Sequence, residues 1–187
     1  MRFPIPTLLA VWSAAAFAGT GSSVDAETGL TTWQTESQGI QVRLTQISPD
    51  QARSFYQARG FSPAAAERYA SECVFMTVVR NIGDTPIQHR LADWRYESAG
   101  VPPRAIRSKT EWERIWKQLG AAESARIAFT WAQFPDTQTF ASGDWNQGMT
   151  SYSVPRGGQF DLRVVWRAGG TIHSEKLEQV KCAHENS

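Results

Sequence analysis

Few side chains in this sequence could carry out a reaction. The 187 residues include only 3 His and 2 Cys. The sequence after residue 26 contains no nucleophile elbow, zinc-protease pair, phosphate-binding glycine loop or dinucleotide fingerprint. Because a catalytic triad is defined by geometry rather than by sequence order, His89 or His173 could still serve as the base of a small hydrolase. We expect instead a protein that is not an enzyme and has no cofactor.

A copper site is the other chemistry that these side chains allow. Cu(I) accepts thioether and imidazole ligands, which Met149, His89 and His173 would supply. Trp145 lies four residues before Met149 and could add the face of its ring. A periplasmic copper-binding chaperone with these Met, His and Trp ligands is therefore the first alternative function, with copper as its cofactor.

The positions of the histidines also suit structural roles. His89 alternates with Ile87 and Leu91, which favours a partly buried histidine with satisfied hydrogen bonds on an apolar strand face. His173 lies in a predicted hairpin, where we expect it to face solvent.

Cys73 and Cys182 are predicted to form a disulfide. Two cysteines in one domain of an exported protein are most simply paired, because the compartment is oxidising. The loop that they close is long, and for about 100 residues the chain-entropy model gives roughly 4 to 5 kcal/mol of stabilisation. The alternative is a soft metal site that uses Cys182 together with His184.

Residues 1–26 have the pattern of a signal peptide and processing region. Arg2 supplies a positive start, residues 5–17 are apolar, and small residues precede two candidate cleavage sites, after Ala18 and after Ala26. The run 19–23 is expected to be accessible and without regular structure. The pattern predicts a periplasmic or secreted protein but does not decide between the two cleavage sites.

Charge and hydropathy argue against two classes of partner. The 19 basic residues are balanced by 18 acidic ones, so no large positive charge is available to attract nucleic acid. No apolar run after the leader approaches the ~20 residues that span a bilayer. We expect neither nucleic-acid binding nor stable membrane insertion after removal of the leader.

Residues 27–187 are predicted to form a single mainly β domain. Alternating or continuous apolar residues predict strands at 40–47, 73–80, 86–97, 125–131, 137–140, 149–154, 160–166 and 171–182. A bulge or bend is expected between Leu91 and Trp94, and Val101-Pro102-Pro103 is expected to break the chain.

Two helical insertions interrupt these strands, at about 49–71 and 109–119. Their starts combine capping serines with Pro49, Pro63 or an acidic residue in the first turn. Many short strands without regular alternation of strand and helix predict an antiparallel β-sandwich.

The hairpin at residues 143–149 is the first candidate for a recognition surface. Asp144, Trp145, Asn146 and Met149 lie in it, and an indole and a thioether on an exposed tip indicate a binding role. The competing interpretation is that Trp145 and Met149 fold back over the end of the sandwich.

Trp94, Arg95 and Tyr96 form a second aromatic and charged cluster. Such residues anchor protein interfaces. We expect this strand end to join the Trp145 hairpin in one aromatic surface, while the alternative is an Arg95 side chain stacked on Trp94 at the edge of the sandwich.

Two stretches resemble the bacterial exported proteins that have telokin-like immunoglobulin sandwiches. In residues 74–87 a strand leads through Asn81-Ile82-Gly83-Asp84-Thr85-Pro86 into the next strand. In residues 142–164, Ser142-Gly143-Asp144 starts a strand that ends at a Pro155 corner before another strand. The helical insertions depart from the plain pattern of this group.

The resemblance implies an immunoglobulin-like β-sandwich with a binding or accessory role and no catalytic residues. We therefore expect an exported, non-enzymatic accessory protein that recognises an unknown protein of the periplasm.

Overall fold

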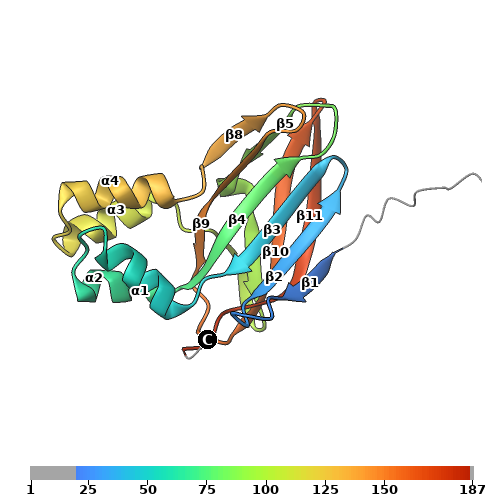
Figure 1. Ribbon diagram of the computed structural model, residues 1–187. Coiled ribbons are helices and arrows are strands. Elements are labelled where there is room, and N and C mark those ends of the chain that lie inside the picture. The colour runs from blue at the N-terminus through green and yellow to red at the C-terminus, as the bar shows by residue number, and fades with distance from the viewer. Residues whose placement is uncertain (1–19, 186–187) are drawn as a thin grey trace, which may run out of the picture.

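The chain folds into a mainly β structure with two antiparallel sheets and a block of helices. A computed structural model describes residues 20–185 (Figure 1). The five-stranded sheet, called sheet A here, has the order β1 (Gly21–Val24), β2 (Thr31–Ser37), β3 (Ile40–Gln46), β4 (Cys73–Asn81) and β9 (Trp145–Tyr152).

The six-stranded sheet is called sheet B. Its central strand, β10 (Gln159–Ala168), pairs with β11 (Thr171–Lys181) on one side and with β5 (Ile87–Arg90) and β6 (Arg95–Ser98) on the other. β8 (Thr137–Phe140) pairs with β5, and β7 (Val101–Ala105) pairs with β6. The Val101-Pro102-Pro103 segment is thus an edge strand rather than a break, a position that tolerates prolines.

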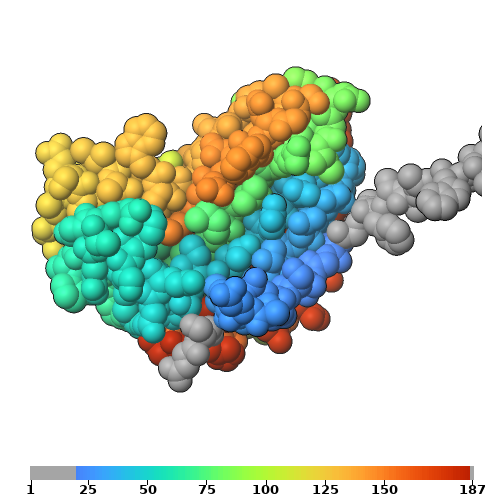
Figure 2. Space-filling model, viewed as in Figure 1, coloured from blue at the N-terminus to red at the C-terminus, as the bar shows by residue number. Residues whose placement is uncertain are grey.

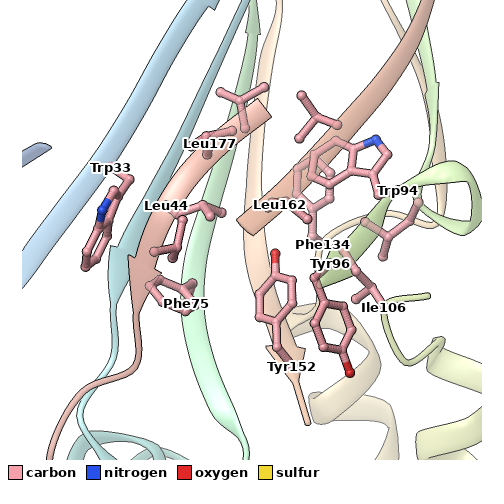
Figure 3. Packing of buried hydrophobic residues seen from close by; sticks show 14 of the residues in the cluster. Trp33, Leu44, Phe75, Trp94, Tyr96, Ile106, Phe134, Tyr152, Leu162 and Leu177 are labelled. Atoms are coloured by element: carbon pink, nitrogen blue, oxygen red, sulfur yellow. The ribbon is translucent and has the colours of Figure 1, made fainter. Parts of the chain in front are cut away.

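The two sheets share one hydrophobic core. Ile40, Val42 and Leu44 alternate along β3 and are fully buried, as the period-2 pattern predicted. Figure 3 shows side chains of sheet A, such as Phe75, on one side of this core and side chains of sheet B, such as Leu162, on the other.

The Sγ atoms of Cys73 and Cys182 lie at bonding distance, with their Cα atoms 5.2 Å apart. This confirms the predicted pair and excludes the metal site of Cys182 with His184. The bond joins β4 of sheet A to the segment that follows β11 of sheet B.

Four helices form a block at one end of sheet A (Figure 1). α1 (Pro49–Gln57) and α2 (Pro63–Ala70) confirm the first insertion, between β3 and β4. Ser48 and Gln51 exchange the two hydrogen bonds of a capping box, which fixes the start of α1.

The second insertion is longer than predicted. α3 (Lys109–Gln118) is followed by α4 (Glu123–Ala132), so the strand expected at 125–131 is wrong. Ala125 and Phe129, one helical turn apart, are buried against the other helices, whereas Ile127 and Trp131 are exposed. Ile127, Phe129 and Trp131 alternate in the sequence, although Phe129 lies on the buried face of α4 and the other two on its exposed face. This alternation imitated the pattern of a strand.

Residues 20–23 of the run that was expected to lack regular structure are more ordered than predicted. Residues 21–24 form β1, which pairs with β2, and Thr20 is hydrogen-bonded through its hydroxyl to Thr35. The rest of the predicted leader, residues 1–19, lies outside the described residues. No helix within residues 20–185 is long and apolar enough to cross a membrane.

Candidate functional site

The structure does not form the predicted surface that joins Trp94 to Trp145. Trp94 is fully buried, and its indole Nε1 donates a 3.0 Å hydrogen bond to the Val165 carbonyl. Tyr96 is buried as well, and its hydroxyl accepts a 3.1 Å hydrogen bond from the Ser153 N–H. Both residues belong to the core of the protein.

A short 3-10 turn explains this burial. The turn at Leu91–Asp93 separates β5 from β6 and confirms the predicted bend. It changes the phase of the chain, so Ile87 and His89 before it and Trp94 and Tyr96 after it face the core. Arg95 alone of the second cluster is exposed, and it donates to the Ala92 and Trp94 carbonyls at 2.6 and 2.7 Å.

The proposed copper ligands lie apart. Met149 is buried between sheet A and the helical block, where its sulfur atom accepts a 3.2 Å hydrogen bond from the Tyr56 hydroxyl. His89 lies on the other side of sheet A, in the core, so the two side chains cannot share one ion. Within residues 20–185 no group of three or more His, Cys, Asp or Glu side chains is placed to hold a metal.

His89 is buried without hydrogen bonds, which corrects the expectation of a satisfied histidine. Within residues 20–185 neither ring nitrogen has a hydrogen-bond partner, and the ring packs against Trp94, Phe134 and Phe140. Burial in these apolar surroundings lowers the pKa of His89 to about 4. His89 therefore has no hydrogen bond to a serine or an aspartate of the kind that a hydrolase triad needs.

His173 is half-buried rather than fully exposed to solvent. It lies opposite Trp166 on the neighbouring strand, and the two rings stack with their centroids 5.6 Å apart. His89 lies opposite Trp166 on the other side of β10. The two histidines thus flank one tryptophan across sheet B.

Of the two apolar residues in the predicted 143–149 hairpin, Trp145 fits the interpretation of an exposed recognition residue and Met149 the interpretation of a buried one. Residues 145–149 belong to β9 rather than to a loop. Trp145 is 58% exposed at the start of this strand, whereas Met149, four residues further, is only 4% exposed beneath the helices. The recognition role therefore remains open to Trp145 and is lost for Met149.

The neighbours of Trp145 fix its strand in place. The Asp144 carboxylate accepts a 2.9 Å hydrogen bond from the Ala141 N–H and shapes the turn before β9. The Asn146 amide donates to Gln138 at 2.6 Å, on the face opposite to Trp145. These two hydrogen bonds help to position the strand that carries the tryptophan.

A groove on the outer face of sheet A surrounds Trp145. The groove has a volume of about 630 Å³, and its lining includes three side chains from β3, three from β4 and two from β9. The strand register arranges these side chains in rows: Gln41, Arg80 and Trp145; then Arg43, Val78 and Gln147; then Thr45 and Met76, beside the buried Met149. Gly143 completes the lining.

The helical block ends the groove on one side. Ser151 of β9 accepts a 3.0 Å hydrogen bond from the Trp112 indole, so α3 covers the outer face there. From that contact toward Arg80 and Trp145 the face becomes progressively uncovered. The molecular surface is hollowed between the helical block and the β8–β9 end of the molecule (Figure 2).

Positive charge dominates the groove. Its lining contains Arg43 and Arg80 but no carboxylate. Within residues 20–185 neither arginine forms an ion pair. Glu36, on the neighbouring strand β2, is already engaged by the side-chain amides of Gln34 and Gln41. A guanidinium that has no carboxylate partner remains able to bind one from another molecule.

A second hollow, between α3 and α4, has a different character. Trp131 lies at its edge and is 85% exposed. Here Arg126 and Lys117 both pair with Glu113, so each cation of the hollow already has a carboxylate partner. The groove of sheet A is therefore the stronger candidate for a binding site.

Sequence reasoning missed the arginines and glutamines of the groove. The alternation of Gln41 and Arg43 with buried residues did predict that they share the outer face of one strand. Their approach to Arg80 and Trp145 depends on pairing between strands that lie far apart in the sequence.

Comparisons with protein-family models, curated protein sequences and solved structures find no match to this chain.

Proposed function

We propose that this chain is an exported, non-enzymatic binding or accessory protein that recognises another protein through the groove of sheet A. The observation that carries the proposal is the exposed indole of Trp145 directly opposite the unpaired Arg80. Tryptophan and arginine are the residues most enriched among those that dominate binding energy in protein interfaces.

The composition of the groove supports a protein partner. Its lining lacks Lys, Glu and Asp, which are depleted from the centres of protein interfaces, and combines arginine and tryptophan with Met76 and Val78. Two of the three strands beneath the groove, β3 and β4, pair with a strand on both sides, which gives it a rigid floor.

We further propose that the two sheets form an immunoglobulin-like β-sandwich resembling the telokin-like exported proteins. Their shared core and antiparallel strands support this topology. The signal-peptide pattern of residues 1–26 supports a periplasmic or secreted location. Copper binding by Met149 and His89 is not proposed, because these two side chains lie on opposite sides of sheet A.

A comparison of two tryptophan variants tests the proposed function. The exported protein, its Trp145→Ser variant and its Trp131→Ser variant would each be immobilised and exposed to periplasmic extract. We expect a protein that is captured by the wild type and by Trp131→Ser but is lost by Trp145→Ser. Equal capture by all three proteins, or no captured protein at all, would contradict the proposal.

A further inference from the structure

We infer that the groove of sheet A recognises an extended acidic segment in which two carboxylates are separated by one residue. This inference deepens the proposed function and rests on it. It specifies which chemistry the partner must present to Arg43, Arg80 and Trp145.

The charge of the groove requires an acidic partner. Arg43 and Arg80 are exposed and have no ion pair within residues 20–185. A neutral partner would cover both guanidinium groups and leave them without compensation for the lost water. A partner that brings carboxylates makes charge-assisted hydrogen bonds at the same positions.

The spacing of the two arginines selects the pattern of those carboxylates. Arg43 lies opposite Val78, and Arg80 is two residues further along β4, so the arginines form a diagonal pair across two strands. Diagonal neighbours in a sheet are separated by about 7–8 Å. Side chains on one face of an extended peptide recur every two residues, at roughly 6.6–6.8 Å, so positions i and i+2 match this spacing.

Trp145 adds an apolar contact next to the second carboxylate. It lies directly opposite Arg80, on the side of β4 away from Arg43. An apolar or aromatic side chain two residues after the second carboxylate lies on the same face of the peptide and can cover the indole, which is 58% exposed. Val78 provides apolar surface between Arg43 and Gln147.

Recognition by Arg43 of β3 and Arg80 of β4 must occur through side chains rather than through strand addition. β3 and β4 each pair with a strand on both sides, so neither offers a free backbone edge. Outside β9, Gln133 forms a bridge with Met149. The specificity of the groove therefore resides in the side-chain pattern described above.

A set of synthetic peptides tests this inference. The probe is an octapeptide that contains Glu-Ser-Glu-Ser-Phe, with the two glutamates and the phenylalanine on one face, and its controls are the Gln-Ser-Gln-Ser-Phe and Glu-Glu-Ser-Ser-Phe versions. Oligogalacturonate serves as an acidic probe that is not a peptide. Binding to the exported protein would be measured by isothermal titration calorimetry at low and at physiological salt.

We expect Glu-Ser-Glu-Ser-Phe to bind at least tenfold more tightly than either control peptide or oligogalacturonate. Arg43→Gln and Arg80→Gln should each weaken its binding about tenfold. Arg167→Gln is the matched control, because Arg167 is exposed on sheet B, and it should leave the affinity unchanged. Trp145→Ser should weaken binding at both salt concentrations.

Three results would overturn the inference: equal binding of the glutamine peptide, preferential binding of oligogalacturonate, or equal losses in all three arginine variants. Capture of a partner that needs Trp145 but is unaffected by Arg43→Gln and Arg80→Gln would leave the proposed function standing and remove the acidic-segment inference alone.

Discussion

The Tyr56 hydroxyl donates a 3.2 Å hydrogen bond to the Met149 sulfur atom at the buried contact between α1 and β9. The same hydroxyl accepts a 2.7 Å hydrogen bond from the Gln133 amide, whose oxygen accepts another from Tyr69. Burial raises the pKa of Tyr56 far above its ordinary value, so the hydroxyl keeps its proton. This network joins the helices to sheet A.

Replacement of Tyr56 by phenylalanine should loosen this junction. The variant leaves the Gln133 amide buried without its acceptor, so the free energy of unfolding should fall by about 1–3 kcal/mol. Urea denaturation measures the loss. Met149→Leu is the control, because it removes only a weak acceptor at similar volume, and it should cost about 1 kcal/mol or less. A larger loss in Met149→Leu than in Tyr56→Phe would refute the importance of the network.

His89 should make the protein sensitive to acid. Its pKa in the folded state is about 4, below the ordinary value of 6.5, so between these values the unfolded chain binds a proton that the folded chain does not. The contribution of the neutral His89 to the free energy of unfolding is therefore fully present above pH 6.5. It is lost as the pH drops toward 4, by at most about 3 kcal/mol.

The pH profile of a His89→Phe variant measures this effect. Its free energy of unfolding should change less than that of the wild type between pH 6.5 and 4, because phenylalanine has no proton to gain. His173→Asn, on the other side of Trp166, should keep the wild-type slope. Parallel profiles for the wild type and His89→Phe would show that another group causes the acid sensitivity.

Removal of the disulfide should reduce stability without abolishing the secondary structure. The bond between Cys73 and Cys182 spans 109 residues, and the chain-entropy model gives up to about 4 to 5 kcal/mol for such a loop. Thermal melting of the oxidised protein, the reduced protein and the Cys73→Ala/Cys182→Ala double variant would measure it. The circular dichroism spectra at low temperature should agree, and identical melting curves would argue against a stabilising bond.

Gly148 should not tolerate a side chain. A Cβ atom at this position would overlap the backbone of Phe134 and lie 2.6 Å from the carbonyl carbon of Gln133. Gly148→Ala must therefore displace the segment that follows α4, at a cost of about 1–3 kcal/mol. In a protein that retains β1, Gly21→Ala is the control, since within residues 20–185 nothing beyond its chain neighbours lies within 4 Å of its Cβ. Equal stability of both variants in denaturant titration would show that the segment can move freely.

Local sequence patterns identified much of the fold but not its longest-range features. The period-2 pattern of β3 and the capping signals of α1 and α3 act within a few residues, so they could be recognised in the sequence. α4 could not, because Ala122 caps it without a side-chain hydrogen bond and its exposed residues include Ile127 and Trp131. Exposed apolar residues conceal the helical period.

The candidate site was predicted only in part, for a similar reason. The exposure of Trp145 agrees with its place beside a polar turn. Trp94 is also flanked by charged residues, yet β10 covers it, and only the three-dimensional fold reveals that contact. The unpaired charge of Arg80 likewise depends on which strands become its neighbours.

If residues 1–26 act as the leader proposed above, the pairing of β1 with β2 gives the choice between its two cleavage sites a physical consequence. Cleavage after Ala18 would keep β1 and the Thr20 contact, whereas cleavage after Ala26 would remove both. In the shorter product, the backbone N–H and C=O groups of β2 that face β1 would be free to pair with a strand of a second molecule. The export machinery would thus set the tendency of the mature chain to self-associate, by trimming eight residues more or fewer.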